Sequence, residues 1–239
     1  MSSLVKDTLG GFLDLLFPPN CLVCGTHGSV DICDLCLKGF ASVAPPYCQR
    51  CGVSTDGTDE FCDDCHSGAG WYFAQARAAG HFSGPLRQAV LALKYGEKRR
   101  LGTPLGAYLA TYLNSQPFGS ITPDVIIPVP LHPSKLRDRG FNQAQLIAKE
   151  VSRTTSLALI ENVLTRNRRT QPQAGLYAEA RIANIRDAFS AVRSPQIEGK
   201  TVLLIDDVIT TMHTIDEAAR VLVNAGAKQV LAASVARGK

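Results

Sequence analysis

Near its C-terminus the chain reads Thr201-Val202-Leu203-Leu204-Ile205-Asp206-Asp207-Val208-Ile209-Thr210-Thr211-Met212-His213-Thr214. The apolar run over 201–205 predicts a buried strand that ends at two adjacent acids. The hydroxyl-rich residues that follow predict a loop leading into a helix over 214–224. Carboxylates can accept hydrogen bonds from the hydroxyls of a ribose, and helix N-terminal N–H groups with threonine hydroxyls suit a phosphate. This order predicts a ribose 5-phosphate site.

A simpler interpretation of the two acids stays open. An aspartate close to the start of a helix commonly caps it. In that case Asp207 caps the helix that follows and Asp206 is merely solvated. The acid pair by itself favours this interpretation.

The surrounding sequence alternates between strand and helix patterns. Apolar runs predict further strands over 76–82, 125–130 and 230–236, and helical spacing predicts helices over 85–93, 104–113 and 142–153. This rhythm predicts an α/β fold with a mainly parallel sheet flanked by helices on both faces. Ligands of such sheets bind at the carboxyl ends of the strands, where Asp206 and Asp207 are expected.

All eight cysteines lie in the first 65 residues, in four Cys-x-x-Cys pairs. Two such pairs supply the four sulfur ligands of a tetrahedral zinc ion. Disulfides need an oxidising compartment, and a thioredoxin-like redox motif would be a single pair on a βαβ unit. We therefore predict two structural Zn²⁺ ions. Their ligands are Cys21, Cys24, Cys33, Cys36, Cys48, Cys51, Cys62 and Cys65.

An internal repeat indicates how the cysteines are shared between the two ions. A pair followed by glycine precedes a pair containing aspartate, and this order occurs twice. Glycine permits a positive φ that turns backbone N–H groups toward the sulfurs. Consecutive pairs therefore most simply share one ion, although a cross-braced arrangement stays open. Closed Cys₄ shells leave no open position for catalysis, so both sites are expected to be structural.

The net charge of +4 combines two parts of opposite sign. Residues 1–70 hold 3 basic and 9 acidic side chains, whereas residues 71–239 hold 22 and 12. We predict an N-terminal module over 1–70, with an amphipathic helix over 4–17 and the two Cys₄ sites, and a second domain over 71–239. The basic domain should attract polyanions such as a diphosphate ligand or a nucleic acid.

Composition excludes several classes of protein. Hydrophobic residues make up 45% and charged residues 19%, which are globular proportions rather than those of a disordered or fibrous chain. No run approaches the roughly 18 apolar residues of a membrane span. The N-terminal segment lacks a basic cluster and a cleavage site, so it is a poor signal peptide. We expect a cytoplasmic protein, with peripheral attachment to the inner face of the membrane as an alternative.

The segment 201–214 resembles the signature of type I phosphoribosyltransferases, which bind 5-phosphoribosyl-1-pyrophosphate (PRPP). The resemblance implies that Asp206 and Asp207 hold the ribose hydroxyls. It also implies that a candidate phosphate loop over 210–214 holds the 5′-phosphate. Its residues are Thr210, Thr211, Met212, His213 and Thr214. Met212 stands where the family has glycine, so we expect the loop to differ locally or to bind phosphate less tightly. His213 adds a possible phosphate donor.

A longer resemblance covers nearly the whole chain. The segment 128–143 is similar to the hallmark of the competence protein F (ComF) family, as are Leu164-Thr165-Arg166, Gln171-Pro172-Gln173 and the residues Arg181, Asn184, Arg186, Ala188 and Phe189. The four Cys pairs ahead of a phosphoribosyltransferase-like domain complete the pattern. The resemblance implies a role in DNA uptake during natural transformation, with DNA-uptake machinery proteins as partners.

The basic residues near this hallmark suit PRPP chemistry. Loss of pyrophosphate from ribose C1 places negative charge on the leaving group, which Mg²⁺ and basic side chains stabilise. Candidates are Lys135, Arg137, Arg139 and Arg166. The stretch 166–173 is expected to be a lid that closes over PRPP. A solvated basic loop and a charged linker are the ordinary alternatives.

Three classes of function compete. The first is an enzyme that transfers a phosphoribosyl group to an unknown small-molecule acceptor in general metabolism. The second is a PRPP- or nucleotide-binding protein that handles incoming single-stranded DNA, and the third is a non-catalytic adaptor whose zinc module docks a partner. We favour a phosphoribosyltransferase-like PRPP-binding protein of the DNA-uptake type. Turnover is left open because of Met212.

Overall fold

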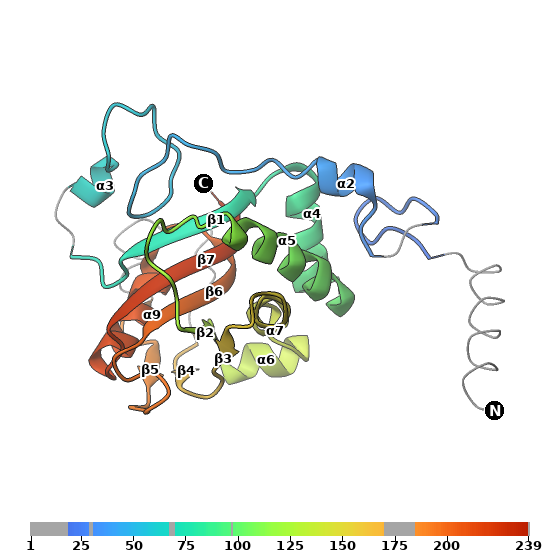
Figure 1. Ribbon diagram of the computed structural model, residues 1–239. Coiled ribbons are helices and arrows are strands. Elements are labelled where there is room, and N and C mark those ends of the chain that lie inside the picture. The colour runs from blue at the N-terminus through green and yellow to red at the C-terminus, as the bar shows by residue number, and fades with distance from the viewer. Residues whose placement is uncertain (1–18, 29–30, 67–69, 97, 170–184, 239) are drawn as a thin grey trace.

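The computed structural model describes residues 19–28, 31–66, 70–96, 98–169 and 185–238 (Figure 1). The helix predicted over 4–17 lies outside these residues. So do residues 170–173 of the predicted lid and several residues of the ComF-like pattern between 171 and 184. Within the described part of the chain, no helix has the length and apolar character that crossing a membrane requires.

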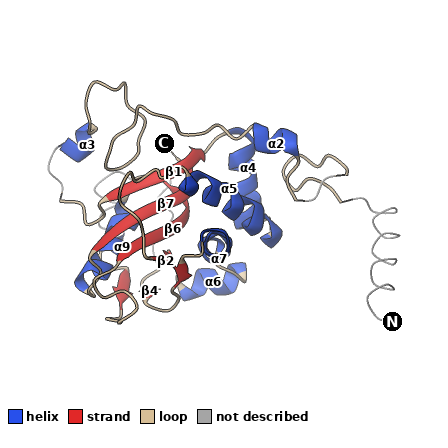
Figure 2. Ribbon diagram, viewed as in Figure 1, coloured by secondary structure: helices blue, strands red, loops and turns tan. Residues whose placement is uncertain are grey.

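A five-stranded parallel sheet forms the centre of the second domain (Figure 2). Its strands lie in the order β1-β7-β6-β2-β3, and every neighbouring pair is parallel. The predicted α/β fold is confirmed. The bounds are β1 Gln75–His81, β2 Val125–Pro128, β3 Ala158–Leu159, β6 Thr201–Ile209 and β7 Gln229–Arg237.

Helices cover both faces of this sheet, as predicted (Figure 1). Side chains alternate along a strand, so Leu203 and Ile205 of β6 pack with one helical layer while Val202 and Leu204 pack with the other. The first layer holds α4 Gly84–Tyr95, α5 Gly102–Asn114 and α7 Gln143–Thr155, and the second holds α9 His213–Asn224. Complete burial of one leucine or isoleucine side chain stabilises the fold by about 1.5–3 kcal/mol.

Strand β6 is longer than the predicted strand over 201–205. It pairs with β7 as far as Ile209, whereas its other neighbour, β2, pairs only as far as Ile205. Asp206 and Asp207 therefore lie inside a strand rather than after one. Because β2 has already ended, one edge of β6 is open beside the two acids.

The basic segment after β2 forms a helix, α6 Pro133–Arg139, which the sequence patterns did not predict. His132 caps it by accepting a hydrogen bond from the Ser134 N–H at 3.2 Å, and Pro133 suits the first turn. Gly140 ends it at φ 76°. Asn142 then caps α7 through the Ala144 N–H at 3.0 Å.

Short elements complete the described structure. The antiparallel pair β4 and β5 packs beside α9 and was not predicted. The remaining bounds are α2 Asp34–Lys38, α3 Asp63–His66, the 3₁₀ helix η1 Arg99–Leu101, β4 Leu164–Arg166 and β5 Phe189–Ala191.

Candidate functional site

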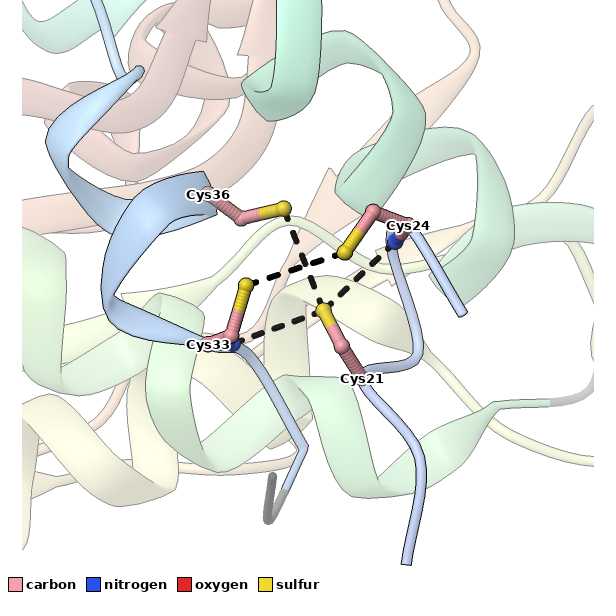
Figure 3. Close-up of side chains that lie close together, drawn as sticks. All are labelled: Cys21, Cys24, Cys33 and Cys36. Carbon is pink, nitrogen blue, oxygen red and sulfur yellow. Dashed lines mark hydrogen bonds between the residues drawn. The ribbon is translucent and has the colours of Figure 1, made fainter. Parts of the chain in front are cut away.

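The eight cysteines form two groups of four, and the sulfurs of each group lie within 4.8 Å of one another. In the first group the sulfurs of Cys21 and Cys36 are 3.9 Å apart and those of Cys24 and Cys33 are 3.7 Å apart (Figure 3). A tetrahedral zinc ion with Zn–S bonds of about 2.3 Å requires sulfur separations of about 3.8 Å. The donor set therefore fits a Cys₄ zinc ion.

Backbone N–H groups of the first cysteine group lie close to one of its sulfurs. The N–H groups of Val23, Cys24 and Cys33 point at the Cys21 sulfur from 3.4, 3.5 and 3.4 Å. Gly25 has the positive φ of 80° that the repeat predicted. Such donors stabilise a thiolate, the form of cysteine that binds metal.

The second group is built in the same way. The sulfurs of Cys51 and Cys62 are 3.6 Å apart, and Gly52 has a φ of 70°. A Cβ on Gly52 would lie 2.5 Å from the carbonyl oxygen of Ala76 in β1, so the glycine also permits close packing on the sheet. The two groups use consecutive Cys pairs, which is the sequential arrangement.

We expect the purified protein to hold two zinc ions per chain, because each Cys₄ group satisfies one tetrahedral ion. Metal analysis against protein concentration measures this directly. Exchanging Cys21 and Cys24 for serine should remove one ion and unfold only the first group. A ratio near one in the natural protein would contradict the two-site prediction.

A cavity of about 660 Å³ opens where β2 ends beside β6. This volume lies within the range of small-molecule pockets. The two acids lie on β6, and the basic residues come from α4, α6, the end of β4 and the segment that follows it. The polar and charged side chains that line it are Lys94, Tyr95, Lys135, Asp138, Arg139, Gln143, Arg166, Arg169, Asp206, Asp207 and Thr214.

Asp207 is buried and held from two sides. Lys94 Nζ lies 2.6 Å from its Oδ2, and Gln143 Nε2 donates a hydrogen bond to its Oδ1 at 3.2 Å. Arg139 in turn donates to the Gln143 side chain at 2.5 Å. Burial opposes the charge of Asp207, but the adjacent Lys94 ammonium and the hydrogen bonds to this carboxyl together lower its pKa. Asp207 is therefore a fixed carboxylate.

The pKa of Asp206 is shifted in the opposite direction to that of Asp207. Burial raises its pKa well above the ordinary value, and the neighbouring Asp207 charge raises it further. Its Oδ1 accepts a hydrogen bond from the Asp207 N–H at 2.8 Å. The charge of Asp207 thus opposes ionisation of Asp206, while Lys94 favours the charged form of Asp207. Neither acid caps α9, whose N-cap is Met212, so the capping interpretation is wrong.

Three of the four predicted basic residues meet at the cavity: Lys135, Arg139 and Arg166. Lys135 and Arg139 are four residues apart on α6 and so share a face. Arg137 lies on another face, and it is absent from the described residues that line the cavity. Burial lowers the pKa of Lys135, and the positive charges of Arg166 and Arg139 lower it further. Crowded cations of this kind favour a bound anion.

The candidate phosphate loop meets the cavity only through Thr214, among its five predicted residues. Thr210 is exposed and Thr211 is half-buried. Met212 adopts the left-handed conformation itself, with φ 61°, so the loop keeps the backbone form that glycine would supply. Its side chain is buried, and the ring of His213 packs 5.8 Å from that of Trp71.

The two residues that hold Asp207 were missed by the sequence analysis. Lys94 ends α4, more than a hundred positions before Asp207, and Gln143 begins α7. The signal for Gln143 was its place beside the Asn142 helix cap. Lys94 had only its place in a Lys-Tyr-Gly helix end, which does not indicate a partner.

Comparison with known families agrees with both parts of the structure. Residues 12–66 match the double zinc ribbon domain, and residues 106–239 match the phosphoribosyl transferase domain. The fold and its two kinds of site define a protein with a phosphoribosyltransferase-like domain behind a double zinc ribbon.

Three similar proteins show which family within this class the chain belongs to. Competence protein F of Haemophilus influenzae is 30% identical, over 86% of this chain and 90% of the relative. DNA utilization protein YhgH of Escherichia coli K12 is 27% identical, over 90% and 96%, and competence protein ComFC of Bacillus subtilis is 24% identical, over 86% and 89%. The chain belongs to the competence protein F family.

Proposed function

We propose that this protein binds PRPP, or a related phosphoribosyl ligand, in the cavity beside β6 and handles incoming single-stranded DNA or nucleotides in the cytoplasm. The observation that carries the proposal is the juxtaposition, in one cavity, of the Asp206–Asp207 pair and the basic groups of Lys135, Arg139 and Arg166. The carboxyl groups suit ribose hydroxyls, and the cations suit the phosphates. The names of the relatives support the connection with DNA.

Different residues would contact different parts of the ligand. Asp206 and Asp207 line the cavity and would meet the sugar hydroxyls, with Asp207 held in place by Lys94 and Gln143. Lys135, Arg139 and Arg166 stabilise the pyrophosphate, and Thr214 at the start of α9 contacts the 5′-phosphate. Arg139 also orients Gln143, so ligand contacts on the two sides of the cavity are linked.

Mg²⁺ would enter with the ligand. Within the described residues, the clusters with metal-ligand geometry are the two Cys₄ groups, so the acid pair does not form a complete protein site for Mg²⁺. Magnesium commonly binds through one or two carboxylates together with substrate phosphates, and the acid pair with a bound pyrophosphate offers that combination. When bound, the ion neutralises charge on the pyrophosphate.

Phosphoribosyl transfer to a small-molecule acceptor is the enzymatic version of this proposal. The C1–O bond to pyrophosphate breaks, a bond from the acceptor to C1 forms, and pyrophosphate leaves. The basic wall of the cavity would stabilise the departing pyrophosphate. A zinc-dependent adaptor without this chemistry is the remaining alternative.

One experiment separates these functions. PRPP and ribose 5-phosphate are titrated calorimetrically into the natural protein with Mg²⁺, and pyrophosphate release is then measured with nucleobases, amines and single-stranded DNA. Binding without release supports the handling function, and release with one acceptor identifies an enzyme. Absence of binding by both ligands would overturn the proposal and leave the adaptor.

We expect single-stranded DNA to bind the basic domain with an affinity that falls steeply as salt is added, because binding releases counterions from phosphates. Reversing the charges of Arg166, Arg168 and Arg169 should weaken binding equally for different sequences, measured by fluorescence anisotropy. Arg87→Glu is the matched control, since Arg87 is exposed on α4 and stands apart from the described cavity residues. An equal loss in the control, or binding insensitive to salt, would contradict the assignment.

A further inference from the structure

The two Cys₄ groups pack on different parts of the second domain. Cys21 and Cys36 of the first group share a buried cluster with residues of α4 and α5. Cys48, Cys51 and Cys65 of the second group share the other cluster, which contains Met212 of the candidate phosphate loop and Ile215 of α9. Only the second group thus belongs to the cluster that supports the loop.

Arg237 joins the second group to the loop directly. It lies at the end of β7, and its Nη1 donates a hydrogen bond to the carbonyl oxygen of Cys51 at 2.9 Å. The same Nη1 lies 3.6 Å from the sulfur of Met212. Met212 is the residue whose positive φ begins α9. A zinc ligand residue and the turn of the loop are therefore held by one guanidinium nitrogen.

The segment that leads from the second group to β1 makes two more contacts with α9. The N–H of Tyr72 donates to Asp216 Oδ1 at 2.6 Å. The rings of Trp71 and His213 pack with their centroids 5.8 Å apart and their planes inclined by 31°. His213 and Asp216 both lie in the first turn of α9. Three contacts thus hold this turn on the side of the zinc module.

Backbone strain explains why such support is useful. A non-glycine residue at positive φ is strained and persists where its surroundings determine the conformation. Met212 is 5% exposed, and its side chain is packed against Arg237. The zinc module thus supplies from outside the loop what a glycine would supply within it.

We infer that the second Cys₄ site positions the candidate phosphate loop through Arg237 and Trp71, so that zinc binding at this site and phosphate binding at the loop strengthen each other. The inference rests on the proposed function, because it takes the loop as the seat of the ligand's 5′-phosphate. Coupling between two sites is reciprocal, so each ligand should raise the affinity for the other by the same factor.

The first test uses Arg237→Met, which keeps an unbranched aliphatic stem and removes the charge and the donors. Affinity for ribose 5-phosphate, measured by calorimetry, should fall about tenfold, a typical size for coupling between sites. Arg237→Lys should restore part of it, because one donor and the charge return. Arg100→Met is the matched control: Arg100 pairs with Asp31 at 3.0 Å beside the first zinc group and should leave affinity unchanged.

Two further measurements test the coupling between the second zinc site and the candidate phosphate loop. The chain contains one tryptophan, so ribose 5-phosphate should change Trp71 fluorescence in the natural protein and much less in His213→Ala. In competition with a chromophoric chelator, ribose 5-phosphate should protect one of the two zinc ions. That protection should disappear in Arg237→Met and persist in Arg100→Met.

These experiments distinguish failure of the coupling from failure of the proposed function. If ribose 5-phosphate binds the natural protein but Arg237→Met binds equally well and neither zinc ion is protected, the inference is wrong while the proposed function stands. Equal losses in Arg237→Met and Arg100→Met would also overturn it, since they indicate general destabilisation. If ribose 5-phosphate does not bind the natural protein at all, the proposed function fails and the coupling fails with it.

Discussion

Replacing Asp206 and Asp207 together by asparagine is expected to weaken PRPP binding about a hundredfold or more, since each hydrogen bond to a charged group contributes about 1.5–3 kcal/mol. Asparagine keeps the size of each side chain but removes the carboxylate that accepts from ribose hydroxyls. Calorimetry with Mg²⁺ measures the affinity, and thermal unfolding of the same samples measures stability. The variant also leaves Lys94 without its partner, so some loss of stability is expected, and the affinities are compared between samples that are folded.

Asp138→Asn is the matched control for this double variant. Asp138 lines the same cavity from α6, so its replacement removes a negative charge from the same place. A phosphate ligand should bind the control as tightly as the natural protein or more tightly, because the cavity becomes more positive. PRPP affinity that is unchanged in the double variant would show that the acids serve the fold and not the ligand.

The parts of the molecule that the sequence predicted are those whose signals are local. A cysteine pair carries its own turn, so four pairs with a repeated glycine were enough to predict two zinc groups and their sequential arrangement. The apolar run before Asp206 likewise identified β6, because a strand buried on both faces is continuously hydrophobic. These patterns depend on neighbours within a few residues.

The parts that were missed depend on contacts between distant segments. Strand β6 extends to Ile209 because β7 continues beside it, which the sequence of β6 does not encode. Lys94 reaches Asp207 only because α4 packs on the sheet with its C-terminal end at the cavity. The contact of Met212 with Arg237 of β7 likewise joins segments that are far apart in the sequence. A local pattern cannot predict such tertiary partners.

Replacing Lys94 by methionine is expected to destabilise the protein by about 3–5 kcal/mol at neutral pH, the usual cost of removing one partner of a buried ion pair. The side chain of Asp207 is only 3% exposed, so its charge would be left buried without a counter-ion. Urea denaturation with zinc present measures the free energy of unfolding.

The destabilisation caused by Lys94→Met should become smaller as the pH falls. In the natural protein Lys94 lowers the pKa of Asp207, so this pair contributes stability above the ordinary pKa of an aspartate, and the contribution is lost as the pH falls through the lowered value. Without Lys94, the largest opposing influence is lost and burial shifts the pKa of Asp207 upward. The variant then gains stability, relative to the natural protein, as the pH falls and the carboxyl takes up a proton.

The comparison must be made between proteins at the same pH, because acid also weakens zinc binding by thiolates in both. The double variant Lys94→Met with Asp207→Asn is the control, since it removes both charges and should be more stable at neutral pH than Lys94→Met alone. A double-mutant cycle then isolates the energy of the pair. A cost below about 1 kcal/mol that is the same at pH 7 and pH 5 would place this pair among solvated surface ion pairs and remove Lys94 as the counter-ion of the acid pair.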